Sequence, residues 1–409
     1  MRKGLQMLFV AAVLVAGAAE CRASANPGRE MLETIRTLAV SEFRGRGIGT
    51  PELDRAARLI AERFESLGLM PGGPQGSWYQ EWVDPDLKIA MRNVVGVLPG
   101  RNPHLAVQSV VVGAHYDHLG MRPATPGEQP VIHPGADDNA SGVAVMLEVA
   151  SRLALALEPE RSVVFVAFTG EEEGRKGSKH YVREEKLHPV SRCIGMVNLD
   201  TVGRLGRNKV IVLGMESARE WPDLFKEAGK VSSVETAAGA PGLDASDQAS
   251  FQDAGVPAVQ LFAGANRDYH RPTDTVDKID VKGLIRVAAL ARAATLYLAN
   301  LEGALTPTLP KQQVRAPEPR MERKVTIGII PDFTYTERGV RLAGVAAGGP
   351  AEAAGLREGD IIIEAGHSPI ADLRDLSEAL KKVRAGDRMP ARILRKDGEQ
   401  QIELEVKEK

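Results

Sequence analysis

Four short segments of the chain are almost entirely apolar, and longer stretches with a helical pattern lie between them. The apolar segments are residues 109–115 (SVVVGAH), 161–170 (RSVVFVAFTG), 194–200 (IGMVNLD) and 256–264 (VPAVQLFAG), and the helix-like stretches are residues 51–67, 140–157 and 281–300. Near-continuous apolar strands are typical of a sheet that is buried on both faces. We therefore expect an α/β fold with a mostly parallel mixed sheet, flanked by helices on both faces.

The composition excludes several classes of protein. Of the 409 residues, 43% are hydrophobic and 26% are charged, which is typical of a globular protein and not of a disordered or fibrous one. The 52 Lys and Arg residues are balanced by 54 Asp and Glu residues, so the formal net charge is −2. Because no basic excess is available to neutralise a phosphate backbone, we expect no nucleic-acid partner.

The first residues of the chain have the pattern of an export signal. Arg2 and Lys3 precede an apolar run from Leu5 to Ala19, which is shorter than the roughly twenty residues of a membrane span but typical of a signal peptide. Small residues before position 26 suit cleavage there. We therefore predict a signal peptide over residues 1–25 and a secreted or periplasmic protein, with a short N-terminal membrane anchor as the alternative. No later segment is apolar for long enough to predict an integral membrane span.

A proline-rich segment divides the rest of the chain. Residues 306–320 (TPTLPKQQVRAPEPR) contain four prolines and no helical or strand period, as in a semi-extended linker. The prediction is a larger domain over residues 26–305, a linker over 306–320 and a small β-rich domain over 321–409.

Residue types that bind metals follow several of the predicted strands. They are His115 and Asp117, Asp137 and Asp138 just before a helix, Glu171 to Glu173, Asp200, and His270 in a later loop. Open parallel sheets bind ligands at the carboxyl ends of their strands, where these residues fall. One carboxylate can bridge two cations about 3.5 to 4 Å apart, as two-metal hydrolases require. The pattern predicts a metal centre at this edge of the sheet.

The motifs that carry these residues resemble a known family. In order they are HxD from His115, GADDNASG (135–142), GEExGxxGSxxY (170–181), NLD (198–200) and YHxPxDT (269–275). Their order and spacing are similar to those of the co-catalytic di-zinc aminopeptidases, a family that includes aminopeptidase Y, glutamate carboxypeptidase II and the glutaminyl cyclases. The resemblance covers most of residues 90–290 and implies the zinc exopeptidase fold.

The resemblance also implies a role for each residue. His115 and Asp200 would hold one zinc ion, Glu172 and His270 would hold a second, and Asp138 would bridge the two. Glu171 would be the general base, and Asp117 would be the carboxylate behind His115. The peptide bond after Asp138 is often cis in such proteins. Six other histidines have no matching motif and are expected to be ordinary surface or loop residues: His104, His118, His133, His180, His188 and His367. A reservation applies to His118, which lies within one turn of His115.

The implied chemistry suits peptide hydrolysis. This reaction needs an activated water, a polarised carbonyl and a proton for the departing amine. Carboxylate and imidazole ligands without thiolate suit zinc. Glu171 directly precedes a ligand, so its carboxylate can reach the attacking water while Glu172 binds metal.

The last part of the chain resembles a PDZ domain of the type found in bacterial proteases. Residues 350–366 (PAEAAGLREGDIIIEAG) carry the resemblance, with a short helix, a turn and a strand. Ile327, Gly328 and Ile329 lie where that family has its carboxylate-binding loop, whose backbone amides capture a peptide C-terminus by strand addition. A helix from about Leu373 to Lys382 would form the other wall. A PDZ fold that only packs against the larger domain is the alternative.

The sequence thus predicts a secreted zinc-dependent aminopeptidase that acts on peptide substrates and uses its PDZ domain for peptide binding or regulation. Two alternatives remain open on the same fold. One is a glutaminyl cyclase-like, dipeptidase or other amide-processing activity. The other is a peptide-binding receptor without catalysis, although such a protein would be expected to lose ligand residues and this chain keeps them.

Overall fold

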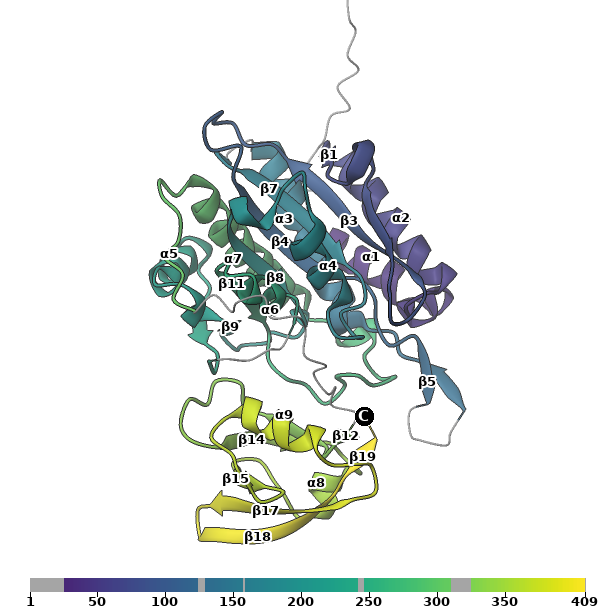
Figure 1. Cartoon of the computed structure of the whole chain (residues 1–409), viewed down its shortest axis with the longest axis vertical. Helices are drawn as coiled ribbons and strands as arrows, with labels where there is room; N and C mark the ends of the chain where they lie inside the picture. Colours follow the sequence, from purple (N-terminus) through teal and green to yellow (C-terminus); the bar gives the residue numbers. More distant parts are fainter. Residues whose placement is uncertain (1–25, 124–128, 157–158, 242–245, 310–324, 409) are drawn as a thin grey trace, which may run out of the picture.

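A nine-stranded mixed sheet forms the centre of the larger domain in this computed structural model, which describes residues 26–123, 129–156, 159–241, 246–309 and 325–408 (Figure 1). The strand order is β1-β3-β7-β4-β8-β11-β9-β10, with β2 paired to β3. The bounds are β1 Met70–Pro71, β2 Tyr79–Val83, β3 Ala90–Leu98, β4 Ser109–His115, β7 Ser162–Phe168, β8 Cys193–Leu199, β9 Val210–Leu213, β10 Thr236–Ala238 and β11 Ala258–Phe262.

The four predicted apolar segments form the four central strands. Strands β7, β4, β8 and β11 run parallel to one another, whereas β3 and β9 pair antiparallel at either side of this group. The expected mixed sheet is therefore confirmed, with its parallel part at the centre. Because parallel strands end at the same edge, the loops that follow these four strands lie together there.

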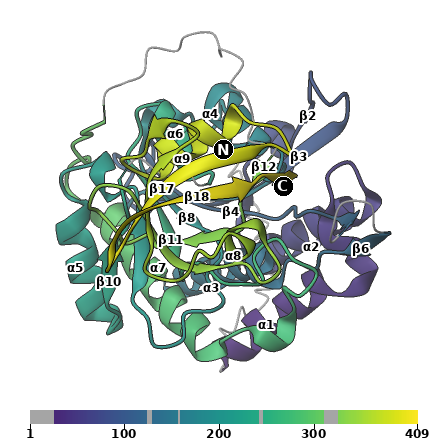
Figure 2. The same cartoon turned by 90° about the horizontal axis from the view of Figure 1, so that it is seen from below.

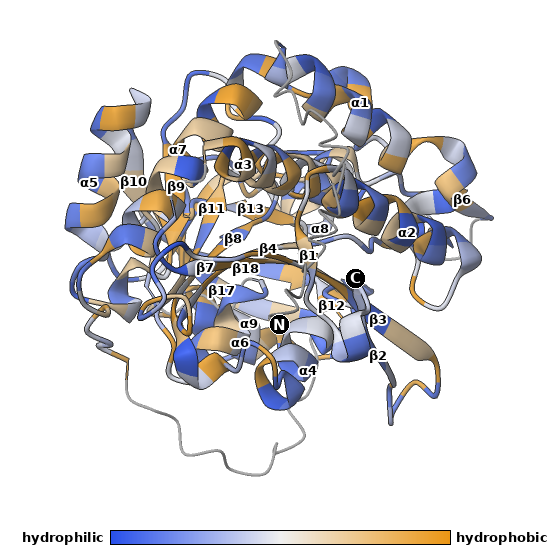
Figure 3. Ribbon diagram, turned by 90° about the horizontal axis from the view of Figure 1, so that it is seen from above, coloured by the Kyte–Doolittle hydropathy of each residue, from blue (hydrophilic) through white to orange (hydrophobic). Residues whose placement is uncertain are grey.

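Helices cover both faces of the sheet, as predicted, and Figure 3 shows the two layers in end view. Alternate residues of each strand point to opposite faces, so Val110 and Val112 join one core while Val111 joins the other. Helices α1, α3 and α7 lie on the first face and α4 and α6 on the second. The bounds are α1 Pro27–Ala39, α2 Pro51–Ser66, α3 Gly142–Ala156, α4 Lys176–Glu184, α5 Trp221–Ser232, α6 Gln248–Asp253 and α7 Val281–Asn300.

Shorter elements connect these layers. A hairpin of β5 and β6 extends from the loop after β4. A tight turn of the π type directly precedes α3. The bounds are β5 Met121–Pro123, β6 Pro130–Ile132, the π turn Ala136–Ser141, and 3-10 turns at Ser41–Arg46, Pro74–Gly76, Val190–Arg192, Met215–Ser217 and Val276–Lys278.

The smaller domain has its own sheets and its own hydrophobic core. Its main sheet has the order β13-β14-β15-β17-β18, with β16 on β15, and β12 pairs with β19. Strand β13 therefore lies at an edge of this sheet. The bounds are β12 Val325–Thr326, β13 Ile329–Pro331, β14 Val340–Val345, α8 Pro350–Ala353, β15 Ile361–Ala365, β16 Ser368–Pro369, α9 Leu373–Lys381, β17 Arg388–Arg395, β18 Gly398–Glu405 and β19 Lys407–Glu408.

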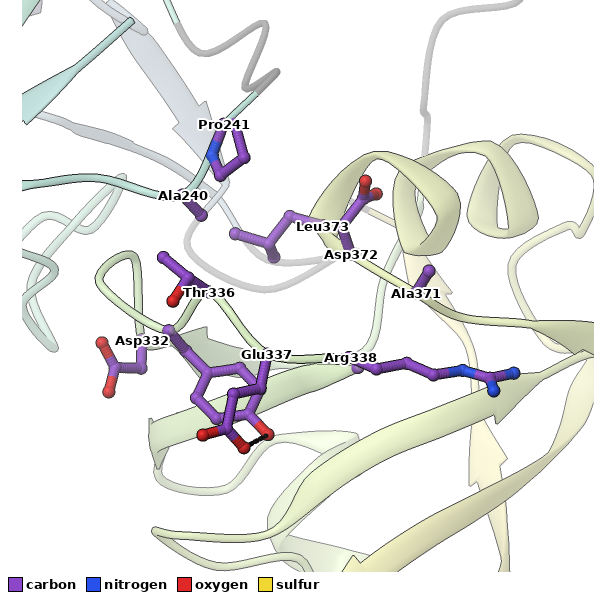
Figure 4. Close-up of a pocket in the computed structure, with 11 residues that line it drawn as sticks. Ala240, Pro241, Asp332, Thr336, Glu337, Arg338, Ala371, Asp372 and Leu373 are labelled. Carbon is purple, nitrogen blue, oxygen red and sulfur yellow. Dashed lines mark hydrogen bonds between the residues drawn. The ribbon is translucent and has the colours of Figure 1, made fainter. Parts of the chain in front are cut away.

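The two domains meet at the edge of the sheet where the parallel strands end (Figures 1 and 2). Phe333, just beyond β13, packs its ring edge-on against Phe262 at the end of β11, with the centroids 5.1 Å apart. The backbone N–H of Ala240 donates to the carbonyl of Phe333 at 2.7 Å. Figure 4 shows the crevice beside this contact, which Ala240 and Pro241 line from the larger domain and residues around Thr336 and Leu373 line from the smaller one.

Several sequence predictions concern segments that the structure does not describe. The predicted signal peptide, residues 1–25, lies outside the described residues, as do residues 310–320 of the predicted linker. The first linker residues pack on the larger domain, since Pro307 bridges to Ala218 and the N–H of Thr308 donates to Ser217. Among the described helices, none is long and apolar enough to cross a bilayer.

Candidate metal centre

His115 is the last residue of β4, at the centre of the parallel group, and its side chain is fully buried. Its Nδ1 lies 3.2 Å from the backbone oxygen of Asp117. Because a carbonyl oxygen only accepts, Nδ1 carries the proton, and Nε2 is left as a ligand atom. That nitrogen lies 3.3 Å from Oδ1 of Asp138 and 3.5 Å from Oδ1 of Asp200, and it has no hydrogen-bond partner among the described residues.

The Asp117 carboxylate has a different contact from the one expected. Its Oδ1 lies 3.8 Å from Nδ1 of His115, which is farther than the backbone oxygen of the same residue. The carboxylate instead accepts the backbone N–H groups of Glu171 and Glu172, at 3.2 and 3.4 Å. It therefore orients the loop after β7, while its carbonyl orients the histidine. Burial raises the pKa of Asp117 to about 7, although His115 opposes this shift.

Asp138 sits in the π turn before α3, and distant residues fix its position. The backbone N–H groups of Asp137 and Asp138 both donate to the Asp274 carboxylate at 3.0 Å, and Arg204 pairs with the same carboxylate at 2.6 Å. The bond from Asp138 to Asn139 is cis, as expected.

The two carboxylate oxygens of Asp138 face different partners. Oδ1 lies toward His115, and Oδ2 lies 3.1 Å from Nε2 of His270. The latter nitrogen is also 3.2 Å from Oε2 of Glu172. Asp138 therefore stands between a set formed with His115 and Asp200 and a set formed with Glu172 and His270, which is the arrangement of a bridging ligand.

The cluster attracts positive charge. Burial lowers the pKa of His270, but the carboxylates of Glu172 and Asp138 outweigh it and raise this pKa to about 9. Burial and the neighbouring Glu172 would raise the pKa of Asp138, but the surrounding imidazoles, His118 first among them, hold it well below its usual value. Ligand atoms that lie within 4.8 Å of one another form two groups that could each hold a cation. The first group is His115, Asp138 and Asp200, and the second is His118, Asp138 and Glu172. The residues present thus fit zinc, which prefers nitrogen and oxygen ligands of this kind.

Glu171 lies beside both groups without belonging to either. It follows Gly170, whose positive φ of 65° turns the chain away from β7. Burial raises the pKa of the Glu171 carboxyl well above its usual value, although His115 opposes this shift. Both Glu171 and Glu172 are half-buried, and the side chain of Glu172 is 4% exposed.

The structure brings all seven predicted residues of the centre to one edge of the sheet and adds two residues to which the sequence analysis assigned no role. His118 is buried inside the second group, with Nδ1 2.8 Å from Oε1 of Glu172. His118 and His133 were expected to be ordinary surface or loop residues, with a reservation for His118; both are buried, so neither is a surface residue. The HxDH spacing was the available signal for His118.

Arg46 is the second addition, and it is fully buried. Its guanidinium donates to four backbone carbonyls, those of Leu38, Tyr116, Pro134 and Gly135, at 2.6 to 2.9 Å. These bonds tie the HxD segment to the turn that carries Asp138. An isolated arginine far from the motifs gave no signal of this role.

In the smaller domain, the predicted carboxylate-binding loop directly precedes the edge strand β13. Ile327 is buried in the domain core, Gly328 has a φ of 71°, and Ile329 begins the strand. The left-handed backbone at Gly328 turns the loop where a peptide terminus would be held.

Comparisons with known proteins also indicate a peptidase domain followed by a PDZ domain. Residues 93–295 match peptidase family M28, and residues 325–406 match the PDZ domain family. The chain is 28% identical over 236 residues to aminopeptidase YwaD of Bacillus subtilis, a match that covers 55% of this chain and 48% of YwaD. The chain thus spans about half the length of that relative.

Two solved structures share the fold of the larger domain. BSAP, a zinc aminopeptidase from Bacillus subtilis, aligns with a TM-score of 0.54 and 18% identity over 71% of this chain and 100% of its own. Porphyromonas gingivalis glutaminyl cyclase aligns with a TM-score of 0.53 and 19% identity over 65% of this chain and 96% of its own. The chain thus contains a peptidase family M28 domain over residues 93–295, followed by a PDZ domain over residues 325–406.

Proposed function

We propose that this protein is an aminopeptidase that uses two zinc ions and removes residues from the free N-termini of peptides. The observation that carries the proposal is the position of Asp138, whose two oxygens face two separate sets of ligand residues. His115 and Asp200 would complete one set, and Glu172 and His270 the other. Similarity to an aminopeptidase over the matched 236 residues supports the reaction class.

Each protein group has a definite task in this proposal. When bound, the two zinc ions would lower the pKa of a water molecule and stabilise negative charge on the peptide carbonyl oxygen. Glu171 would take the proton of the attacking water and pass it to the departing amine. Asp117 would hold the backbone of Glu171 and Glu172 through its carboxylate. Arg46 and Asp274 would keep Asp138 in place between the two ligand sets.

A matched pair of peptides tests the reaction. We expect the zinc-loaded protein to release the first residue from pentapeptides with a free N-terminal amine. It should leave the N-acetylated counterparts intact, because an aminopeptidase requires a free N-terminus. Mass spectrometry of the products, with a chelator-treated sample as control, measures this. Cleavage of acetylated peptides at internal bonds would contradict an aminopeptidase. Loss of ammonia from peptides that begin with glutamine, without release of a residue, would favour the cyclase alternative.

For the PDZ domain we propose capture of a peptide C-terminus along β13. A terminus held at Ile327 to Ile329 would extend its chain toward Pro331, because β13 begins at that loop. The N-terminal part of the peptide would then point toward Phe333, which contacts the peptidase domain at Phe262. This direction supports a role in presenting peptides to the larger domain.

The expected result is that a peptide with a free C-terminal carboxylate binds the full chain at least about tenfold more tightly than its C-terminal amide, since charge-assisted hydrogen bonds would be lost. Peptides labelled at the N-terminus and ending in valine, leucine or phenylalanine suit fluorescence anisotropy, because the label also blocks the aminopeptidase reaction. Equal affinity of the acid and amide forms across these peptides would contradict this proposal and favour a PDZ domain that only packs against the larger domain.

Export is a further proposal, supported by the charged and apolar pattern of residues 1–25. Sequencing the N-terminus of the protein purified from its native host tests it, and a mature start near Asn26 is expected.

A further inference from the structure

The buried ring of His118 has no role in the mechanism described so far. Its side chain is 0% exposed, and neither Nδ1 nor Nε2 makes a hydrogen bond with the described residues. Leaving buried polar atoms unsatisfied is unfavourable, so such atoms call for an explanation. Nδ1 is nevertheless only 2.8 Å from Oε1 of Glu172 and 3.8 Å from Oδ2 of Asp138.

The 2.8 Å between Nδ1 and Oε1 would by itself suit a hydrogen bond, but the two atoms lack hydrogen-bond geometry. A cation shared by the two atoms would account for their close approach. Ligand atoms bound tetrahedrally to zinc at about 2.0 to 2.1 Å lie roughly 3.3 Å from one another. His270 Nε2 lies at 3.1 and 3.2 Å from Asp138 and Glu172, and the His118 distances of 2.8 and 3.8 Å fall on either side of this value. Glu172 thus offers one oxygen to each of the two imidazoles.

The surrounding backbone fixes the His118 ring in this place. Its backbone N–H donates to the carbonyl of Arg46 at 3.1 Å. The ring also lies against Gly135, where a side chain would come within 2.6 Å of the imidazole carbons. With a φ of 59°, Gly135 has a conformation that favours glycine, and the lack of a Cβ there leaves room for the ring. The same glycine leads into the turn that carries Asp138.

We propose that Nδ1 of His118 is a fourth protein ligand of the second zinc ion, together with Asp138, Glu172 and His270. The inference rests on the proposed two-zinc centre and gives the two ions different numbers of protein ligands. The second ion would have four protein ligands, while the first would have His115, Asp138 and Asp200 and would keep an open position. Closed coordination is typical of structural zinc and an open position of catalytic zinc, so the first ion would be the one that takes the substrate carbonyl.

Zinc titration of the metal-free protein against a chromogenic chelator tests this assignment. The wild-type chain is expected to bind two ions, and His118→Ala is expected to weaken one of them about a hundredfold or more while leaving the other unchanged, since even indirect contacts to a metal site change affinity 10- to 100-fold. The matched control is His133→Ala. Its ring is also buried without a hydrogen-bond partner among the described residues. No ion pair among the described residues joins it to the carboxylate of Asp138 or Glu172. This control should bind both ions as the wild type does.

Each outcome separates the two proposals. Two ions in the wild type and two equally tight ions in His118→Ala would overturn the role of His118 and leave the proposed function intact. A wild type that binds fewer than two ions would contradict the two-zinc centre itself. An equal loss in His118→Ala and His133→Ala would show general damage to the fold and would also count against His118 as a ligand.

X-ray absorption spectroscopy of the zinc-loaded wild type gives a second test that needs no variant. Coordination by His115, His118 and His270 predicts an average of one and a half imidazoles for each zinc ion. An average of one, from His115 and His270 alone, would overturn the assignment.

Discussion

Replacing Glu171 with glutamine is expected to lower turnover about a thousandfold while both zinc ions stay bound. The side chain keeps its size but can no longer accept a proton, and general-base catalysis by one positioned group contributes roughly 10²- to 10⁴-fold. Its backbone N–H still donates to Asp117, so the loop after β7 should keep its conformation. The measurement is kcat on a free-amino peptide together with the zinc content of the same sample.

Glu173→Gln provides the control for this variant. Glu173 lies in the same acidic run, but its carboxylate pairs with Arg122 at 2.6 Å and not with the metal-binding residues. We expect its turnover to stay within about twofold of the wild type, as is usual for loss of a partly exposed ion pair. A Glu171→Gln protein with full zinc content and normal turnover would remove Glu171 from the mechanism.

The second large effect is expected from Asp138→Ala, which should reduce bound zinc below two ions per chain and abolish measurable peptide hydrolysis. Both ligand sets depend on this carboxylate, since one oxygen faces His115 and the other faces His270. Its removal also leaves buried imidazoles and carboxylates without their central partner. Elemental analysis after gel filtration, combined with the peptide assay, measures both effects.

Asp223→Ala, on the exposed face of α5, controls for the loss of an acidic residue and should retain full zinc and activity. Melting curves of both metal-free variants show whether either has lost its fold. An Asp138→Ala protein that folds, binds two zinc ions and hydrolyses peptides at the wild-type rate would be incompatible with a bridging carboxylate.

The strands of the centre and their ligand residues could be predicted because both signals are local. The apolar runs that form β4, β7, β8 and β11 are continuous in sequence, and His115, Glu172 and Asp200 lie at or just after the ends of three of them. Asp138 and His270 lie in later loops and were indicated by the family motifs. Parallel pairing then brings the strand ends to one edge. The structure therefore gathers His115, Asp138, Glu172, Asp200 and His270 as the motifs suggested.

The residues that hold these ligands in place could not be predicted, because their contacts join distant parts of the chain. Asp274 binds the backbone of Asp138 across 136 positions of sequence, and Arg46 reaches Gly135 across 89. Neither contact follows a helical or strand period. The burial of His118 was not predicted for a related reason, since only the fold of the loop after β4 shows that its ring turns inward.

The contact between the domains could not be predicted from the sequence either. Phe262 appeared in the sequence as one more apolar residue at a strand end, and Phe333 lay in a short segment after the predicted carboxylate-binding loop. Their ring contact brings the PDZ domain to the edge of the sheet that carries the metal centre. A proline-rich linker between two domains predicts that they are separate units but gives no information on which surfaces meet.

The most direct test of the two-zinc centre is anomalous diffraction at the zinc absorption edge from crystals of the zinc-loaded protein. We predict two peaks about 3.5 to 4 Å apart, one beside His115 and Asp200 and the other beside Glu172 and His270, with one oxygen of Asp138 bound to each. A single peak in fully loaded crystals, or two peaks of which only one contacts Asp138, would contradict this prediction.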